Sequence, residues 1–212
     1  MTEQRKKYEL TDEYIEHFGR KLYRIKALVA LGAVAAGELG GYIESERNLD
    51  QYGDAWVYGN AWVYGNARVY GNAWVYGNAL VYGDARVYGN AWVYGDAWVY
   101  GDARVYGNAW VYGDARVYGD AWVYGNARVY GDAWVRSCAV ISESKMIFWA
   151  SNVGSENGTL TVFNGKESLI VTRGCFVGTL DEFLAKSAEV HDDKIKREYE
   201  LLIEVAKSRI LG

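Results

Sequence analysis

Residues 52–135 consist of one six-residue unit, Tyr-Gly-[Asn/Asp]-Ala-x-Val, repeated in tandem fourteen times without an insertion or a deletion. The first copy begins at Tyr52 and the last ends at Val135. Self-similarity at a fixed short period is typical of solenoid proteins, in which each repeat packs mainly against its neighbours. This pattern constrains the fold strongly, because the same local structure has to satisfy it in every copy.

The six positions of the unit divide into a strand and a turn. Ala-x-Val-Tyr suits a short strand, since β-branched Val and aromatic Tyr both favour extended backbone. Side chains alternate along a strand, so Ala and Val share one face while x and Tyr share the other. Gly followed by Asn or Asp is a turn pair, because these residues tolerate positive φ. The small Ala-Val face predicts a narrow interior, with Tyr and x pointing outward.

Two folds satisfy this pattern. A meander of hairpins accepts a Gly-Asn turn in every unit. A β-helix instead uses three units as the three sides of one coil, with each strand parallel to the strand three units further on. The x position favours the β-helix, because it follows a threefold rhythm that a meander does not need. In groups of three, x reads Trp56-Trp62-Arg68, Trp74-Leu80-Arg86 and Trp92-Trp98-Arg104, and then shifts to Trp110-Arg116-Trp122 and Arg128-Trp134.

The unit, written as Val-Tyr-Gly-Asn-Ala-x, is similar to the hexapeptide of left-handed parallel β-helix proteins, which carry an aliphatic residue at the first place and a small one at the fifth. The left hand is implied by this resemblance, since spacing alone does not give it. Most members of known activity are acyltransferases, and many form trimers. We therefore expect a mainly β protein built on a left-handed parallel β-helix of about five to six 18-residue coils.

The residues before the repeats are expected to form an N-terminal β cap over residues 1–51. Residues 8–27 read as a hairpin around Gly19, because apolar and charged residues alternate after it. Gly40-Gly41 and residues 48–50 are loop signals. An open β-helix end exposes unpaired strand edges, and such a cap protects them.

After the repeats the six-residue period continues in weaker form, with Ile141, Ile147 and Val153 at the aliphatic place. The solenoid domain is therefore expected to cover residues 52–154. Residues 155–212 are expected to form a C-terminal hairpin, from residues 159–163 and 168–172, followed by two helices.

Two capping signals define the helices. Thr179 and Glu182 form a capping box for a short helix that ends near Glu189, and Asp192 or Asp193 caps a longer one. The longer helix carries an apolar stripe that needs a partner, either the open end of the solenoid or a second subunit. The stripe consists of Ile195, Tyr199, Leu202 and Ala206.

The ends of the chain resemble uncharacterised hexapeptide-repeat proteins of phages and prophages. The resemblance is carried by residues 39–46, which lead into residues 53–57, and by residues 174–183, and it spans nearly the whole chain. It implies an origin and no activity. The partner class that follows from this origin is a host protein.

The composition excludes several classes of function. The net charge of −4 leaves no broad basic surface for nucleic acid. The charged N-terminus, with Glu3 and Arg5, lacks the apolar stretch of a signal peptide, and the apolar segment 27–37 is too short to cross a bilayer. We expect a protein of the bacterial host cytoplasm with no membrane partner.

No pattern in the sequence supports catalysis or a cofactor. The similar acyltransferases depend on a histidine base on a coil or loop, because a base must lie within hydrogen-bond reach of its proton. His17 and His191 both lie outside the repeats. The sequence contains no phosphate loop, GxSxG or HExxH motif. We expect no enzyme activity.

Metal binding is not expected either. Cys138 and Cys175 lack metal-ligand spacing, and we expect both to be reduced core residues. Aspartates at the turns align in threes on two corners, and we interpret them as solvated turn residues. They are Asp96, Asp114 and Asp132 on one corner, and Asp84, Asp102 and Asp120 on another.

The outward columns of rings and guanidinium groups are the candidate functional feature. Tyr, Trp and Arg dominate binding hot spots, and long apolar stripes are unusual on a monomer. We expect a non-catalytic binding or scaffold protein that forms a homo-oligomer, a trimer being favoured over a dimer by the family resemblance. The expected binding residues are Arg68, Arg86, Arg104, Arg116, Trp122 and Arg128. The expected oligomer-interface residues are Trp56, Trp62, Trp74, Trp92, Trp98, Trp110, Trp134, Ile195, Tyr199 and Leu202.

Two other functions remain open from the sequence. A small-ligand binder could stack nucleotides or glycans on the Trp and Tyr rings and hold them with Arg68, Arg86 or Arg104. A degenerate acyltransferase is the weaker alternative, because no histidine lies in the repeats.

Overall fold

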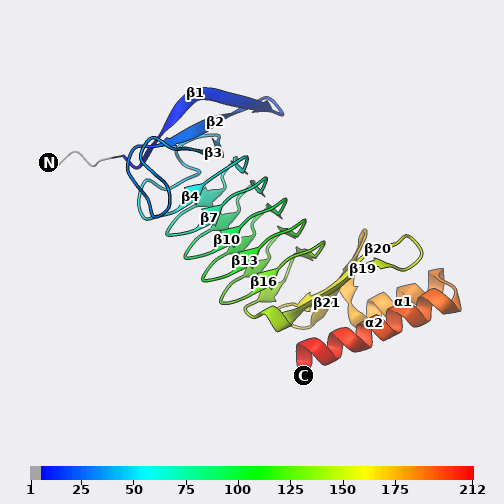
Figure 1. Ribbon diagram of the computed structural model, residues 1–212. Helices are drawn as coiled ribbons and strands as arrows, with labels where there is room; N and C mark the ends of the chain where they lie inside the picture. The colour runs from blue at the N-terminus through cyan, green and yellow to red at the C-terminus, as the bar shows by residue number, and fades with distance from the viewer. Residues whose placement is uncertain (1–5) are drawn as a thin grey trace.

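The computed structural model describes residues 6–212, so Glu3 and Arg5 of the charged N-terminus lie outside the described residues. The chain forms a β-solenoid with a β cap at one end and a small sheet with two helices at the other (Figure 1). This confirms the three-sided solenoid and the two end modules that the sequence predicts.

Each unit contributes one short strand, which pairs in parallel with the strand three units further on. Trp56 pairs with Trp74 and Val57 with Val75, for example. The parallel pairing excludes the meander of hairpins. The repeat strands are β4 (Trp56–Val57), β5 (Trp62–Val63), β6 (Arg68–Val69), β7 (Trp74–Val75), β8 (Leu80–Val81), β9 (Arg86–Val87), β10 (Trp92–Val93), β11 (Trp98–Val99), β12 (Arg104–Val105), β13 (Trp110–Val111), β14 (Arg116–Tyr118), β15 (Trp122–Val123), β16 (Arg128–Val129) and β17 (Trp134–Arg136).

These strands assemble into three sheets, one for each side of the coil. One sheet runs β4-β7-β10-β13-β16, and a second runs β6-β9-β12-β15-β18, with β18 at Val140–Ile141. The third runs β1-β2-β3-β5-β8-β11-β14-β17 and so carries the N-terminal cap at its edge. The cap strands are β1 (Tyr8–His17), β2 (Arg20–Ala27) and β3 (Leu39–Ile43).

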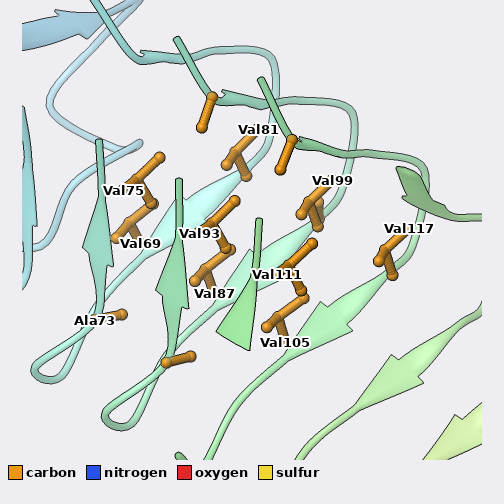
Figure 2. Packing of buried hydrophobic residues seen from close by; sticks show 14 of the residues in the cluster. Val69, Ala73, Val75, Val81, Val87, Val93, Val99, Val105, Val111 and Val117 are labelled. Atoms are coloured by element: carbon orange, nitrogen blue, oxygen red, sulfur yellow. The ribbon is translucent and has the colours of Figure 1, made fainter. Parts of the chain in front are cut away.

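The interior of the solenoid is built from the Ala and Val positions. The Ala and Val side chains of all fourteen units are fully buried. Figure 2 shows valines from the three sides pointing into the tube, where they pack against one another. The predicted division of the unit into a small apolar inside and a large outside is confirmed.

The turn glycines serve both the conformation and the packing of the corners. All fourteen have φ between 61° and 75°, which L side chains rarely adopt. The corners also stack closely. A Cβ on Gly89, for example, would lie 3.0 Å from the backbone nitrogen of Gly107 in the next coil. Each corner therefore needs glycine for two independent reasons.

The solenoid begins earlier than the repeat does. In β3, Ile43 pairs with Val63 in parallel, and Leu49 forms a parallel bridge with Val69. Both Ile43 and Leu49 are fully buried, like the valines that follow them. In sequence, each of these two residues lies two positions further from its partner than paired residues in the regular coils do. The first coil is therefore slightly longer than the others. The interior of the solenoid therefore extends into residues 1–51, which the sequence predicts to form only a cap.

Gly40 and Gly41 are also part of this first coil and not of a loop. Both lie within β3. A Cβ on Gly40 would lie 2.6 Å from the carbonyl oxygen of Val57, and one on Gly41 would lie 2.6 Å from that of Ala61. The glycines are needed for close backbone approach, which sequence alone does not distinguish from a turn.

Hydrogen bonds from Lys7 connect the start of the cap to the first complete coil. Its ammonium group donates to the carbonyl oxygens of Tyr52, Gly53 and Ala55, the last at 2.8 Å, and the residue is 3% exposed. Burial lowers the pKa of Lys7 to about 8, against the opposing effect of Asp50 and Asp54.

This lowered pKa predicts that the protein becomes more stable between pH 8 and pH 10. In that window the unfolded chain keeps the Lys7 proton while the folded state releases it, so the free energy of unfolding rises with pH. The rise is at most about 1.4 kcal/mol per pH unit. Denaturant titrations at several pH values should show this rise in the wild type and not in Lys7→Met. The same slope in both proteins would contradict the prediction.

The solenoid ends at Ile141, and the predicted continuation to residue 154 is wrong. After the short helix η1 (Ser144–Met146), β19 (Ile147–Val153) pairs antiparallel with β20 (Gly158–Asn164). Ile147 and Val153 keep the six-residue spacing as members of one long strand. The segment after Ile141 has no Gly-Asn turn pair before β19, so the chain cannot turn the next corner in the same way.

The C-terminal module is a four-stranded antiparallel sheet covered by two helices. The predicted hairpin is confirmed as β20 and β21 (Leu169–Arg173), and β22 (Phe176–Thr179) adds a strand that was not predicted. Helix α1 spans Leu180–Val190 and begins with the predicted capping box, and α2 spans Asp193–Leu211 with Asp192 as its N-cap.

The apolar stripe of α2 finds its partner within this module. Tyr199 is 1% exposed and packs edge-on against Phe183 of α1, in a core shared with β20 and β21. Ile195 and Leu202 are half-buried against the same core. The prediction that the stripe covers the solenoid end or a second subunit is therefore wrong. The sequence did not show that β19 and β22 complete a sheet able to receive it.

Candidate functional site

Each of the three solenoid faces presents one column of x residues, and the columns are those that the sequence predicts. The Trp face carries Trp56, Trp74, Trp92, Trp110 and Arg128. The mixed face carries Trp62, Leu80, Trp98, Arg116 and Trp134. The Arg face carries Arg68, Arg86, Arg104 and Trp122.

A column of stacked tyrosines runs beside each x column. Successive rings lie 4.7–5.0 Å apart, centroid to centroid, and within 7° of parallel. Stacked pairs of this kind add about 0.5–1.5 kcal/mol each beyond burial. The stacks are Tyr64-Tyr82-Tyr100-Tyr118, Tyr70-Tyr88-Tyr106-Tyr124 and Tyr76-Tyr94-Tyr112-Tyr130.

Burial within the stacks raises the pKa of several of these phenols. Burial, together with the neighbouring Tyr118 and Tyr82, raises the pKa of Tyr100 to about 12, against the opposing effect of Arg116 and Arg136. Burial is also the main cause of the raised pKa of the other affected tyrosines in the stacks, which are Tyr64, Tyr70, Tyr76, Tyr82, Tyr94, Tyr106 and Tyr112.

On the Trp face the rings become accessible only beyond the first coil. Trp56 is fully buried beneath the cap, with its ring 6.3 Å from that of Tyr8. Trp92 and Trp110 stack at 5.3 Å, and Arg128 lies 4.7 Å from the Trp110 ring. Trp92 is 38% exposed. The predicted interface role is therefore wrong for Trp56, because its own chain covers it.

On the mixed face, Arg116 is held between two indole rings. Its guanidinium carbon lies 4.6 Å from the Trp98 ring and 4.8 Å from the Trp134 ring. At the N-terminal end, His17 of the cap packs edge-on against Trp62 at 5.0 Å. The Arg116 guanidinium and the His17 ring therefore both reduce the accessible aromatic surface of this face.

The Arg face carries its cations in one straight column. Arg68 and Arg86 are exposed, Arg104 is half-buried, and Trp122 is 36% exposed. Arg104 lies 5.2 Å from the Trp122 ring, and Arg68 lies 5.6 Å from the Tyr70 ring. A tyrosine ring therefore lies beside the guanidinium of Arg68, whereas Arg104, Arg116 and Arg128 lie over tryptophans.

The six predicted binding residues do not form one site. Arg68, Arg86, Arg104 and Trp122 are brought together on the Arg face, whereas Arg116 and Arg128 lie on the other two faces. Of the three faces, the Arg face is therefore the one that collects several of them into a continuous surface.

The corners between the faces carry polar columns. On one corner, the side chain of Asn72 donates a hydrogen bond to Asn90, that of Asn90 to Asn108 and that of Asn108 to Asn126, at 3.1–3.2 Å. On the other two, Asn66 donates to Asp84 and Asn78 to Asp96, both at 3.0 Å. Within residues 6–212, no group of three or more His, Cys, Asp or Glu side chains is placed to hold a metal ion.

Both histidines pack against aromatic rings, at opposite ends of the molecule. His17 of the cap contacts Trp62 and Tyr64 of the solenoid, and His191, at the end of α1, lies 5.6 Å from Tyr199. The cysteines are unpaired. Cys138 is partly exposed, and Cys175 is exposed at the turn between β21 and β22, so the prediction that both are core residues is wrong.

The fold and the repeated surface define a β-solenoid repeat protein. Overlapping segments between residues 61 and 137 match a family model described as YdcK beta solenoid repeat. The matched segments are residues 61–77, 73–87, 85–101, 97–113, 109–125 and 121–137, which is less than half of the chain. No curated protein matches the sequence. None of the helices in residues 6–212 has both the length and the apolar character that a membrane span needs.

Proposed function

We propose that this protein is a non-catalytic binding and scaffold module and that the Arg face is its protein-binding surface. The proposal is carried by the column of Arg68, Arg86 and Arg104. Among residues 6–212, no carboxylate, including those of Asp84 and Asp102 on the neighbouring corner, lies within 4.0 Å of these three cations. A regular, unpaired basic column beside tyrosine and tryptophan rings suits a partner with acidic side chains.

The partner class that fits this proposal is a host protein, if the resemblance of the chain ends to phage and prophage proteins reflects its origin. The β-solenoid supports a scaffold role because its flat faces repeat the same groups at fixed spacing. The histidines support the non-catalytic part of the proposal, since both belong to the end modules, where they pack against rings.

Affinity capture from host lysate tests the Arg face. We expect the wild type to retain a reproducible protein partner and the variant Arg68→Ser/Arg86→Ser/Arg104→Ser to lose it, because the column supplies the charge that recognises it. Arg197→Ser is the matched control, since Arg197 lies on α2 and pairs with Glu200. Retention of the same proteins by the triple variant, or no reproducible partner for the wild type, would contradict the proposal.

Self-association is a separate part of the proposal. Trp74, Trp92, Trp98, Trp110 and Trp134 remain partly accessible on two faces, and we expect copies of the chain to cover them, a trimer being favoured over a dimer. Light scattering should then give about three times the chain mass of 23.8 kDa, and Trp92→Ala should weaken the assembly. A monomer at all concentrations would exclude it.

A further inference from the structure

A cleft lies where the end of the Trp face meets the C-terminal module. Its volume is about 520 Å³, and its walls come from the last coils, the segment around η1, β19 and α2. Figure 1 shows the C-terminal end of α2 lying beside the last coil, and α2 contacts η1. The cleft therefore joins residues that are far apart in the sequence, such as Tyr112 and Arg209.

The charge of the cleft is positive. Arg128, Lys145 and Arg209 line it, and none of the described carboxylates does. Within the described part of the chain, these three cations form no ion pair with a carboxylate. The C-terminal end of α2 contributes roughly −0.5 charge, which three full positive charges outweigh. The cleft is thus a local region of positive charge on a protein whose net charge is −4.

The same cleft is walled by aromatic rings in two orientations. Tyr112 and Tyr130 are the last members of a tyrosine stack, 5.0 Å apart. Trp149 lies 4.3 Å from Tyr130 with its plane turned by 81°. Tyr130 is 39% exposed, and Val205 of α2 is 47% exposed at the opposite wall. Tyr112 is stacked between Tyr94 and Tyr130, so a planar group entering the cleft can pack against the remaining surfaces of Tyr130 and Trp149 and against the aliphatic side chain of Val205.

We infer that this cleft binds a nucleoside phosphate. The rings and Val205 would hold the base, and Arg128, Lys145 and Arg209 would hold the phosphates. A phosphate group carries about −1.5 to −2 charges at pH 7, so three cations match a phosphorylated ligand better than a monocarboxylate. The volume lies within the usual range for small-molecule sites, about 300–1,000 Å³. This site is distinct from the Arg face and goes beyond the proposed function.

A mononucleotide fits the surroundings better than an extended nucleic acid. Asp114 and Asp132 follow Tyr112 and Tyr130 on the adjacent corner, outside the cleft. Asp132 accepts a hydrogen bond from Ser151 at 2.8 Å, which fixes one of these carboxylates in place. A polyanion leaving the cleft across this corner would meet like charge, whereas a short ligand remains among the three cations.

Calorimetric titration of the full chain at low salt, with ADP as the probe, tests the inference. We expect saturable binding of one ADP per chain. Adenosine and pyrophosphate, which each lack one half of the ligand, should bind at least about tenfold more weakly, as expected when stacking and charge each contribute. Lys145→Ala and Arg209→Ala should each weaken ADP binding about tenfold. Lys207→Ala, an exposed residue of α2 outside the cleft, should bind ADP like the wild type.

Three outcomes would overturn the inference. These are no saturable binding of ADP at millimolar concentration, equal affinity of Lys145→Ala, Arg209→Ala and the wild type, or a single-stranded oligonucleotide that binds at least about tenfold more tightly than ADP. Circular dichroism of each variant confirms that it is folded. The variant Arg68→Ser/Arg86→Ser/Arg104→Ser should bind ADP like the wild type, because these residues lie outside the cleft. Failure of this site is therefore distinguishable from failure of the Arg face.

Discussion

Replacing Val87 by aspartate is expected to lower the free energy of unfolding by at least about 3 kcal/mol. Val87 is fully buried in the tube and packs among valines and alanines that offer no hydrogen-bond partner for a carboxylate. Total stability of a domain is commonly about 5–15 kcal/mol, so a cost of this size unfolds a large fraction of the protein on mild heating. Chemical denaturation measures the loss, and thermal unfolding should show a clearly lower Tm.

Arg86→Asp is the matched control for this variant. Arg86 is the neighbouring residue of the same strand, β9, and its side chain is exposed on the outside. The same new side chain should therefore change stability by no more than about 1 kcal/mol there. Burial would also raise the pKa of the new carboxyl at position 87, so the destabilisation should shrink as the pH falls towards 4. Equal losses for the two variants would contradict the inside-outside assignment of the unit.

Alkaline pH is expected to unfold the protein cooperatively as the tyrosine stacks ionise. Burial raises the pKa of several stacked phenols above the ordinary value of 10, among them Tyr76 and Tyr82, and raises that of Tyr100 to about 12. The unfolded chain therefore loses its tyrosine protons at lower pH than the folded chain does. The resulting stability is fully present below pH 10 and is lost as the pH rises through the folded values. Each such tyrosine contributes a slope of up to about 1.4 kcal/mol per pH unit, reduced by solvent screening for the more exposed rings.

Variants at Tyr100 distinguish unfolding caused by ionisation of the tyrosine stacks from a general effect of alkaline pH on stability. Tyr100→Phe keeps a ring between Tyr82 and Tyr118 and removes one phenol, so its unfolding should move to higher pH. Tyr100→Ala removes the ring as well, and this variant should be less stable already at pH 7. Tyrosinate absorbance and circular dichroism should change together. Ionisation of all tyrosines near pH 10 while the fold persists would refute the prediction.

The regular part of the fold could be predicted from the sequence because one local rule is repeated without interruption. The Ala-Val interior, the turn glycines and the pairing of strands three units apart all follow from the unit, and the columns of the three faces were correctly assigned. The capping box of α1, the N-cap of α2 and the two predicted hairpins depend on residues close together in sequence and were also correct. These are the features that strand alternation and turn chemistry determine locally.

What the sequence did not show depends on contacts between distant residues. The first coil is slightly longer than the rest, so Ile43 and Leu49 fall outside a strict count of six. The interface prediction failed for Trp56 and Tyr199, because the cap and the C-terminal sheet bury them. Lys145, Trp149 and Arg209 were missed as candidate ligand contacts, since the cleft forms only when α2 folds back beside the last coil.

The uninterrupted stacking of the coils makes the solenoid a spacer of defined length and angle. Adjacent coils are separated by the strand spacing of about 4.8 Å, and both end modules are attached to the first and last of them. Loss of three consecutive units would shorten the distance between the modules by one coil and preserve their mutual orientation. Loss of a single unit would instead rotate one module by a third of a turn relative to the other. The number of repeats therefore sets both the relative orientation of the two end modules and the distance between them.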